Sequence, residues 1–332
     1  MTTVLSRRRF ITLAAAAAGL PLLLKTQSSA PRLARWEGTA LGAPASIQLY
    51  HQNEAQAQTA LHAAIAELQR LEKIFSVYRA DSAISSLNRT GSLENAPKDL
   101  MFLLEHALTL AKISDGFYDP TVQPLWQLYF RHFTASNPNL EGPSAAEIQN
   151  TLSRVDWQNV EVDIKQQRIT FSRPRVEITL NGGAQGYITD RVADVLRVHG
   201  FESMLVDMGE PRAFSTKPDG SAWRVGIANP ADPSRSVATL DLLDQCISTS
   251  GGYGTLFDLE GKFTHLLDPK TGRTAPAYFS VSVVAKSGTI ADGLSTALLL
   301  APPDRRQSIL TAAGGQKAIF VTPKGIDSTL VA

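Results

Sequence analysis

The sequence predicts an α+β protein in which mixed or largely antiparallel sheets pack against helices. From Val160 onward, short segments of alternating polar and apolar residues follow one another at hairpin-like spacing, whereas long helical patterns dominate before that point. The chain has 332 residues, 43% of them hydrophobic, and can therefore bury a large core. Strands joined by turns pair antiparallel, so a doubly wound parallel sheet is disfavoured.

Before residue 160 the pattern is mainly helical. Residues 54–75 carry apolar side chains at helical spacing, and the polar stretch that begins at Thr134 predicts a surface loop. The expected elements are a strand at 45–51, a helix at 54–75, a short helix capped by Asp81 or Ser82, a helix at 97–114 and a helix capped by Ser144.

After residue 160 the pattern is mainly that of strands. Helices are expected at 187–198 and from about Ala291. The expected strands lie at 160–164, 168–172, 176–181, 203–209, 223–228, 237–243, 263–268 and 279–285.

The first residues predict an export signal. "SRRRFI" precedes an apolar, alanine-rich stretch at 12–24 and small residues that end at Ala30, the arrangement of a twin-arginine-type signal. The apolar stretch is short for a membrane span, which needs about 20 residues, although an uncleaved anchor is the alternative. We expect residues 1–30 to be this signal and residues 31–332 to form one catalytic unit in the bacterial periplasm.

Composition excludes several classes of function. Lys+Arg 32 nearly balances Asp+Glu 31, and no basic run follows the first residues, so we expect no nucleic-acid partner. The single cysteine, Cys246, excludes an internal disulfide and a cysteine-based metal cluster. A small polar ligand remains compatible with this composition.

A glycine-rich loop, "LNGGAQGYITD", joins an expected strand to an expected helix. Glycines let the backbone approach a ligand, and amides at a helix N-terminus attract phosphate. The loop matches neither the dinucleotide-binding fingerprint nor the P-loop. It is equally compatible with a turn that only closes the packing of a strand on a helix.

Asp292 and Thr296 lie one helical turn apart in "TIADGLSTALLL", so their oxygens share one helix face. Both are hard ligands of the kind that Mg²⁺ binds together with phosphate and water. In the alternative, Asp292 caps the helix and Thr296 bonds back to its own turn.

The segment "FTHLLDPKTGRTAP" presents His265 shortly before Asp268. Asp268 is expected to cap the turn that follows it, which leaves His265 as a candidate proton acceptor because histidine titrates near neutral pH. A core histidine with satisfied hydrogen bonds is the alternative. The turns "VDMGEPRA", "TSGGYG" and "GFYDPTVQPL" add further Gly and Asp residues at strand ends, a pattern that favours a polar ligand held by backbone groups.

Taken in order, these segments resemble the ApbE family of flavin transferases, which move FMN from FAD onto a threonine or serine of an acceptor protein and release AMP. The resemblance spans nearly the whole chain after the signal and implies an ApbE-like (T-fold-like) architecture. The export signal and the "AQGYITDRVADVL" variant look most like a periplasmic branch associated with nitrous oxide respiration, which implies a membrane electron-transfer protein as acceptor. The matching segments are "LGAPASIQLY", "FSVYRADSAISSLN", "SDGFYDPTVQPLW", "LNGGAQGYITDRVADVL", "MLVDMGE", "WRVGIANP", "ISTSGGY", "THLLDPKTGRTAP" and "VSVVAKSGTIADGLSTALLL".

The resemblance also implies roles for individual residues. His265 falls at the position of the candidate base, and Mg²⁺ is implied on the side chains of Asp292 and Thr296 with backbone oxygens of Ala184 and Ser295. The implied FAD-binding residues are Leu41, Tyr78, Phe117, Tyr118, Asp119, Asn181, Tyr187 and Leu266.

The chain departs from the family pattern at several positions. Gln185 stands where a lysine is common, Thr179 where an aspartate is common and Asn181 where a glycine is common, so one positive and one negative charge are lost. Leu41 replaces a usual methionine, and Glu210 a common glycine. Because glutamine cannot offset phosphate charge, a periplasmic protein that holds FAD without transferring it stays open as an alternative. A second alternative is a Mg²⁺-dependent hydrolase that splits FAD into FMN and AMP, with water in place of the acceptor hydroxyl.

Overall fold

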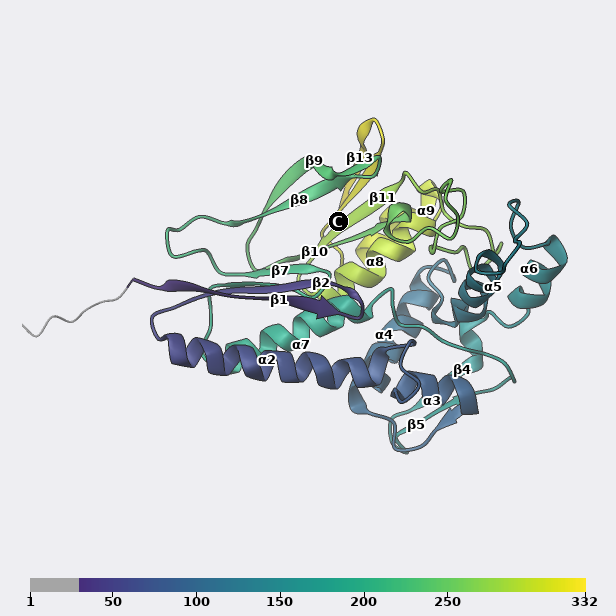
Figure 1. Cartoon of the computed structure of the whole chain (residues 1–332), viewed down its shortest axis with the longest axis horizontal. Coiled ribbons are helices and arrows are strands. Elements are labelled where there is room, and N and C mark those ends of the chain that lie inside the picture. The colour runs from purple at the N-terminus through teal and green to yellow at the C-terminus, as the bar shows by residue number, and fades with distance from the viewer. Residues whose placement is uncertain (1–29) are drawn as a thin grey trace, which may run out of the picture.

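The computed structural model describes residues 30–332 and is built on one large antiparallel sheet (Figure 1). Its strand order is β1-β2-β6-β7-β10-β11-β12-β13. The predicted α+β class with antiparallel sheets is confirmed. The strands are β1 (Arg32–Ala40), β2 (Ala43–His51), β6 (Met204–Asp207), β7 (Pro211–Phe214), β10 (Cys246–Gly251), β11 (Ser280–Ala285), β12 (Lys317–Thr322) and β13 (Gly325–Val331).

Helices cover one face of this sheet and form the main core with it. Strand residues alternate between the two faces: Val281 and Val283 of β11 pack into the helical core, whereas Val284 faces the other side. The helices are α2 (Glu54–Phe75), α3 (Ala83–Thr90), α4 (Lys98–Ile113), α5 (Gln123–Phe133), α6 (Ala145–Leu152), α7 (Ala184–Val198), α8 (Gly288–Leu300) and α9 (Pro303–Ala312).

Two small sheets complete the fold. The hairpin of β8 (Trp223–Asn229) and β9 (Asp232–Leu242) covers the face of the large sheet opposite the helices, where Trp223 and Leu242 pack against Ile319 in a second core. The third sheet, in the order β3-β5-β4, comprises β3 (Ser92–Leu93), β4 (Val160–Asp163) and β5 (Arg168–Phe171).

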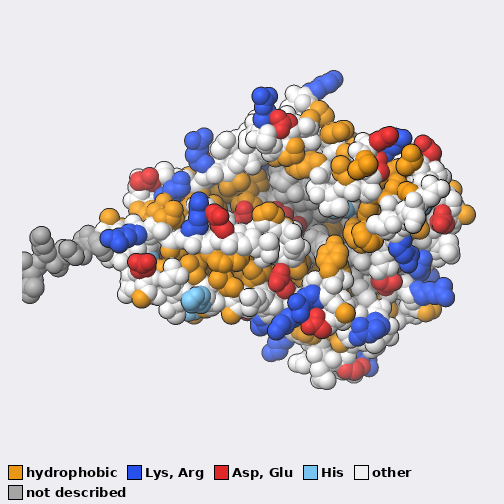
Figure 2. All heavy atoms as spheres, in the orientation of Figure 1, with side chains coloured by type: hydrophobic (Ala, Val, Ile, Leu, Met, Phe, Trp, Pro, Cys, Tyr) orange, Lys and Arg blue, Asp and Glu red, His pale blue; other side chains and the backbone are white. Residues whose placement is uncertain are grey.

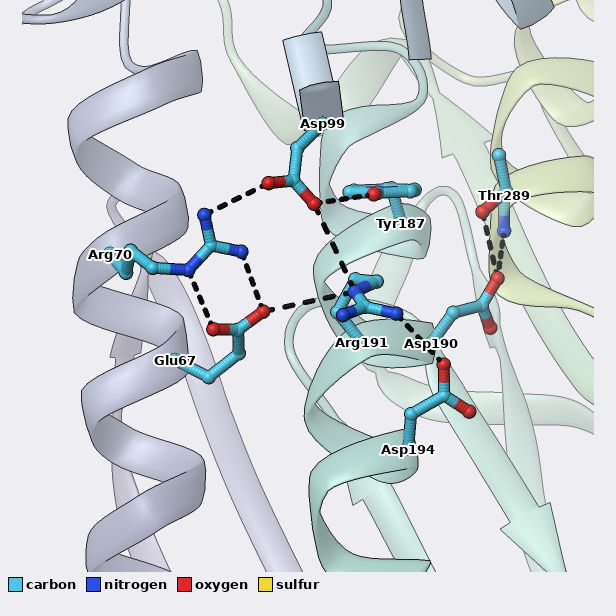
Figure 3. A network of polar contacts seen from close by, with 8 residues as sticks. All are labelled: Glu67, Arg70, Asp99, Tyr187, Asp190, Arg191, Asp194 and Thr289. Atoms are coloured by element: carbon cyan, nitrogen blue, oxygen red, sulfur yellow. Dashed lines mark hydrogen bonds and ion pairs between the residues drawn. The ribbon is translucent and has the colours of Figure 1, made fainter. Parts of the chain in front are cut away.

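Helix α7 is held between α2 and α8 by two sets of polar contacts (Figure 3). On the α2 side, Arg70 pairs with Glu67 and with Asp99 of α4, at 2.7 and 2.9 Å, and Arg191 of α7 approaches both carboxylates. On the α8 side, Asp190 accepts hydrogen bonds from Thr289. Helix α8 lies about 100 residues after α7 in the chain, and these hydrogen bonds fix its position against α7.

Local sequence signals fixed the bounds of several elements. The predicted helix at 54–75 coincides with α2, and 97–114 lies within one residue of α4 at each end. Ser82 caps α3, and Ser144 forms a capping box with Glu147 at the start of α6, as expected.

Two predicted strands are wrong. Residues 176–181 form no strand, because the side chain of Asn88 satisfies both backbone groups of Ile178, each at 2.8 Å, in place of a neighbouring strand. Residues 263–268 make only the isolated bridges Leu256–Thr264 and Leu267–Thr274. The patterns also missed β1, β3, β7, β10, β12 and β13, and the helices α5 and α9.

The predicted export signal, residues 1–30, lies almost wholly outside the described residues, which begin at Ala30. Among the described helices, none combines the length and the apolar character that crossing a membrane requires.

Candidate active site

A pocket of about 480 Å³ opens between the β1–β2 turn, the N-terminal ends of α7 and α8, and the loops that flank α5 and follow β10. Figure 2 shows this face of the molecule hollowed near its centre. Segments that are far apart in the sequence meet here. Of the predicted site residues, the pocket is lined by Phe117, Tyr118, Asp119, Asn181, His265, Leu266, Asp292 and Thr296.

The N-terminal ends of α7 and α8 touch at two glycines. A Cβ atom added to Gly186 would lie 2.1 Å from the carbonyl oxygen of Gly288, so no larger residue fits. This contact brings the amide of Gly186 to the Oδ2 atom of Asp292, 2.9 Å away. The glycine loop thus packs two helices together and also positions the predicted metal-binding carboxylate.

Asp190, one turn further along α7, holds the first turn of α8. Its carboxylate accepts from the amides of Gly288 and Thr289, at 2.7 and 3.0 Å, and pairs with Arg212 of β7. These bonds satisfy amides that a helix start leaves free. The side-chain cap of α8 itself is Ser287, so Asp292 is not the cap that one alternative required.

Four carboxylates line the pocket: Asp207, Glu210 and Asp292 on one side, and Asp119 on the other. Glu210 accepts from the amide of Thr249 at 3.2 Å. Burial, and next the charge of Asp292, raise the pKa of Glu210 well above its usual range. Burial likewise raises the pKa of Asp292. Burial therefore favours the protonated acids at this place, and a bound cation would favour the carboxylates instead.

The donor set around Asp292 fits Mg²⁺. Within residues 30–332, the carboxylate of Asp292 accepts one hydrogen bond, from the amide of Gly186 to Oδ2. The other carboxylate oxygen, Oδ1, therefore remains open to a cation. The hydroxyl of Thr296 lines the same wall. In that part of the chain, no group of three or more His, Cys, Asp or Glu side chains is arranged to hold a metal, so hydroxyl and backbone oxygens would have to contribute. Ala184 and Ser295 are buried behind the wall and do not line the pocket.

A cluster of hydroxyl groups joins β10 to α8 beside this site. The Oγ atom of Ser250 lies 2.7 Å from Oγ of Ser295 and 2.9 Å from Oγ1 of Thr296. The Ser295 hydroxyl donates to the carbonyl oxygen of Asp292 at 2.8 Å. Thr296 is therefore paired with the neighbouring strand and not with its own helical turn, contrary to the other alternative.

His265 lines the pocket, and one of its two ring nitrogens is available as an acceptor. Its Nδ1 atom lies 3.1 Å from the carbonyl oxygen of Thr255, which can only accept, so Nδ1 carries the proton. Nε2 is then unprotonated in the neutral ring. Burial lowers the pKa of His265, which keeps the ring neutral at pH 7. As predicted, Asp268 caps the following turn and accepts from the amide of Lys270.

Asp119 organises the opposite wall. Its carboxylate accepts from the amide and hydroxyl of Thr121, at 2.7 and 2.6 Å, and from the amide of Trp157 at 3.1 Å. Burial nevertheless raises its pKa to about 6. Asp119 therefore fixes the loop that carries Phe117 and Tyr118, and any contact it makes with a ligand comes in addition to that structural role.

Three predicted FAD-binding residues lie outside the pocket wall. Tyr187 points into the core, where its hydroxyl donates to Asp99 at 2.7 Å, because residues 185 and 187 of one helix face nearly opposite directions. Leu41 occupies the β1–β2 turn with φ 49°, next to the lining residue Ala43. Tyr78 is 64% exposed at the rim, where its ring packs edge-on against Trp126 and its phenol bonds with Asn181.

The structure adds lining residues that the sequence patterns did not single out, among them Trp126, Gln123 and Tyr253. Trp126 stacks on Phe130 in α5, with ring centroids 5.0 Å apart. Aromatic residues at helical spacing from 126 to 133 were the available signal for this helix. Gln185 and Glu210, noted as departures, both line the pocket, and the Gln185 amide lies against the backbone of Gly209.

These elements together define a polar, metal-compatible pocket on an α+β scaffold, and comparison with known proteins gives its family. The model of the ApbE family matches residues 41–320. The chain belongs to the ApbE family.

Curated relatives of the chain carry the name FAD:protein FMN transferase. The FAD:protein FMN transferase of Salmonella typhimurium strain LT2 is 30% identical over 261 residues, which cover 76% of this chain and 73% of that protein. The FAD:protein FMN transferase of Escherichia coli strain K12 is 28% identical over 270 residues, covering 79% and 76%. The predicted enzyme class, a flavin transferase, is confirmed.

Solved structures agree with the fold. The apo form of the Pseudomonas stutzeri flavinyl transferase ApbE superposes with a TM-score of 0.75 at 27% identity, covering 92% of this chain and 96% of that one. The ApbE protein of Thermotoga maritima superposes with a TM-score of 0.77 at 27% identity, covering 91% and 97%. The predicted ApbE-like architecture is confirmed.

Proposed function

We propose that this protein transfers FMN from FAD to a threonine or serine hydroxyl of an acceptor protein in a Mg²⁺-dependent reaction that releases AMP. The observation that carries the proposal is the meeting of His265, Asp292 and Thr296 in one pocket of a chain that belongs to the ApbE family. The names of its relatives support FAD as the substrate and a protein as the acceptor.

Mg²⁺ would be held by the carboxylate of Asp292 and the hydroxyl of Thr296, with backbone oxygens of Ala184 and Ser295 as the further ligands that the family resemblance implies. When bound, it would offset the charge of the FAD pyrophosphate. Asp190 and Gly186 keep the Asp292 carboxylate in place, since one holds the start of α8 and the other donates to Oδ2.

In the proposed step, the acceptor hydroxyl oxygen attacks the FMN-side phosphorus of FAD, and its proton passes to Nε2 of His265. The new O–P bond forms as the bond to AMP breaks, so AMP leaves with the bridging oxygen. A threonine hydroxyl is a weak nucleophile at neutral pH, and base assistance is typically worth about 10²–10⁴-fold. The Nδ1 bond to Thr255 orients the ring for this role.

We further propose that the protein works in the periplasm after export through a twin-arginine-type signal in residues 1–30. The motive is the "SRRRFI" motif with its apolar stretch. The narrower resemblance favours an acceptor that is the periplasm-facing domain of a membrane electron-transfer protein, in the branch associated with nitrous oxide respiration. Comparing the mass of the exported protein with that of the full chain would test cleavage near Ala30.

The deciding experiment is the intact mass of a candidate acceptor domain after incubation with the mature protein, FAD and Mg²⁺. The expected result is a mass gain equal to FMN that is lost in an acceptor whose target threonine is replaced by alanine, with AMP released. Asp292→Ala in the enzyme should abolish both signals.

Two outcomes would contradict transfer. AMP release that does not depend on acceptor would favour the FAD hydrolase. Tight FAD binding with neither product, using an acceptor that another flavin transferase can modify, would favour a protein that only carries FAD.

A further inference from the structure

The hydroxyl cluster between β10 and α8 has a defined direction of hydrogen bonding. A serine or threonine hydroxyl has one proton to donate and two lone pairs that accept. The Ser295 hydroxyl donates to the carbonyl oxygen of Asp292, which cannot donate in return. Because this bond uses the only hydroxyl proton of Ser295, the Ser295 oxygen must be the acceptor in all of its other hydrogen bonds.

The direction of the remaining bonds follows from this commitment. Ser250 lies 2.7 Å from the Ser295 oxygen and must be the donor there. The proton of Ser250 is then committed as well, so in its 2.9 Å contact with Thr296 the threonine hydroxyl must donate. The order of donation is Thr296 to Ser250, Ser250 to Ser295, and Ser295 to Asp292.

We propose that Ser250 is a positioning residue that fixes the direction of the Thr296 hydroxyl, so that the threonine oxygen turns its lone pairs toward the divalent cation. The inference rests on the proposed function, because it assigns a role toward the metal. Ser250 and Thr296 both line the pocket, whereas Ser295, which links them to the helix backbone, lies buried behind it.

Other groups do not disturb this order. Ser248 lies 3.4 Å from the Ser295 oxygen, but its side chain bonds with the carboxylate of Glu210. Without Ser250, the Thr296 hydroxyl would be free to rotate toward its own helical turn, as threonine hydroxyls in helices often do. A lone pair would then be available to the cation only part of the time.

The test is direct binding of Mn²⁺, as a spectroscopic substitute for Mg²⁺, to the mature protein without FAD. Free Mn²⁺ is measured by electron paramagnetic resonance, and Mg²⁺ competition confirms a shared site. Ser250→Ala should weaken Mn²⁺ binding by up to about tenfold, the upper end of the usual contribution of one hydrogen bond between neutral groups. Ser250→Thr, which keeps the hydroxyl, should restore most of the affinity.

Ser282→Ala is the matched control. It removes a hydroxyl that, like that of Ser250, takes part in a hydrogen bond between side chains. The Ser282 hydroxyl pairs with Thr249 at 2.7 Å across adjacent strands and does not touch Thr296. A thermal melt separates folding from binding, since Ser282→Ala should lower Tm as Ser250→Ala does and leave the Mn²⁺ Kd unchanged.

The two possible failures differ. If the unchanged protein binds Mn²⁺ and Ser250→Ala binds it equally well, the role of Ser250 is overturned while the proposed function stands. If the unchanged protein binds no Mn²⁺ at millimolar concentration and Mg²⁺ does not stimulate AMP release, the metal requirement falls and the inference falls with it.

Discussion

Gly186 and Gly288 are in backbone contact where α7 crosses α8, and each would place an added Cβ within 2.4 Å of the other's carbonyl oxygen. Since the oxygens belong to helix backbones, the clash cannot be relieved by rotating a side chain. The two helices approach this closely only because both positions are glycine. Their crossing sets the distance between the glycine loop and Asp292.

Gly186→Ala should therefore lower the free energy of unfolding by about 1–3 kcal/mol, the usual cost of overpacking a core. Urea denaturation followed by circular dichroism measures the change. Gly183→Ala is the control, because its added Cβ would meet its nearest neighbour at an ordinary 3.5 Å. Equal effects of the two substitutions would contradict the importance of this contact.

Asp190→Asn should destabilise the protein by about 3–5 kcal/mol, because it breaks a buried ion pair with Arg212 and turns an amide NH₂ group toward backbone donors of α8. Asp194→Asn removes a more exposed pair with Arg191 and should cost less than about 1 kcal/mol. Chemical denaturation of both variants measures the change in the free energy of unfolding. If Asp190→Asn lowers it as little as Asp194→Asn does, the position of α8 does not depend on the contacts of Asp190.

His265→Ala should slow FMN transfer by about 10²–10⁴-fold while FAD stays bound, because the ring is proposed to accept a proton. Burial lowers the pKa of His265, so the neutral ring persists at pH 7 and the rate should decline only below the ordinary range of histidine. Single-turnover rates across pH, with FAD affinity measured separately, check this. A loss of affinity at an unchanged rate would make His265 a binding residue.

Glu210→Gln should make the stability of the metal-free protein less sensitive to pH. The folded-state pKa of Glu210 is raised, so its contribution to stability is fully present below the ordinary range near 4.3 and is lost as pH rises through the folded value. Between pH 5 and 8 in EDTA, Tm should fall less in Glu210→Gln than in the unchanged protein. Glu105→Gln, on an exposed position of α4, is the control and should leave the slope unchanged.

Gln185→Lys should bind FAD more tightly without metal, because it returns a positive charge to a wall that contains Asp207, Glu210 and Asp292. The gain should shrink as salt is added, since screening weakens the attraction to phosphate. Flavin fluorescence titrations at low and high ionic strength measure it, with Gln185→Met as an uncharged control of similar length. An equal gain in the methionine variant would assign the effect to packing.

Local signals predicted the elements whose patterns are self-contained. The apolar spacing along residues 54–75 and the caps at Ser82 and Ser144 depend on near neighbours in the chain, and the structure confirms them. The strand expected at 176–181 failed because its backbone partner is the side chain of Asn88, about 90 residues away. Composition and periodicity carry no information about such a partner.

The candidate site, like the fold, was predicted only in part. The sequence brought together Asp292, Thr296 and His265, and the structure places all three in one pocket, but their roles remain predictions. It could not show that Gln185 faces the pocket while Tyr187 faces the core, or that Ser250 of β10 approaches Thr296 within 2.9 Å. Both depend on how α7 and α8 rotate about their axes, which tertiary packing decides.

The pairing of Asn88 with Ile178 has a consequence for hydrogen exchange and for motion. The segment that leads into the glycine loop is held at this point by one side chain through two hydrogen bonds, and it is not part of any sheet. The backbone amide of Ile178 should therefore exchange its hydrogen through a small local opening, faster than the backbone amides of β10 and β11. Such an opening, close to the lining residue Asn181, would break no hydrogen bond of the large sheet.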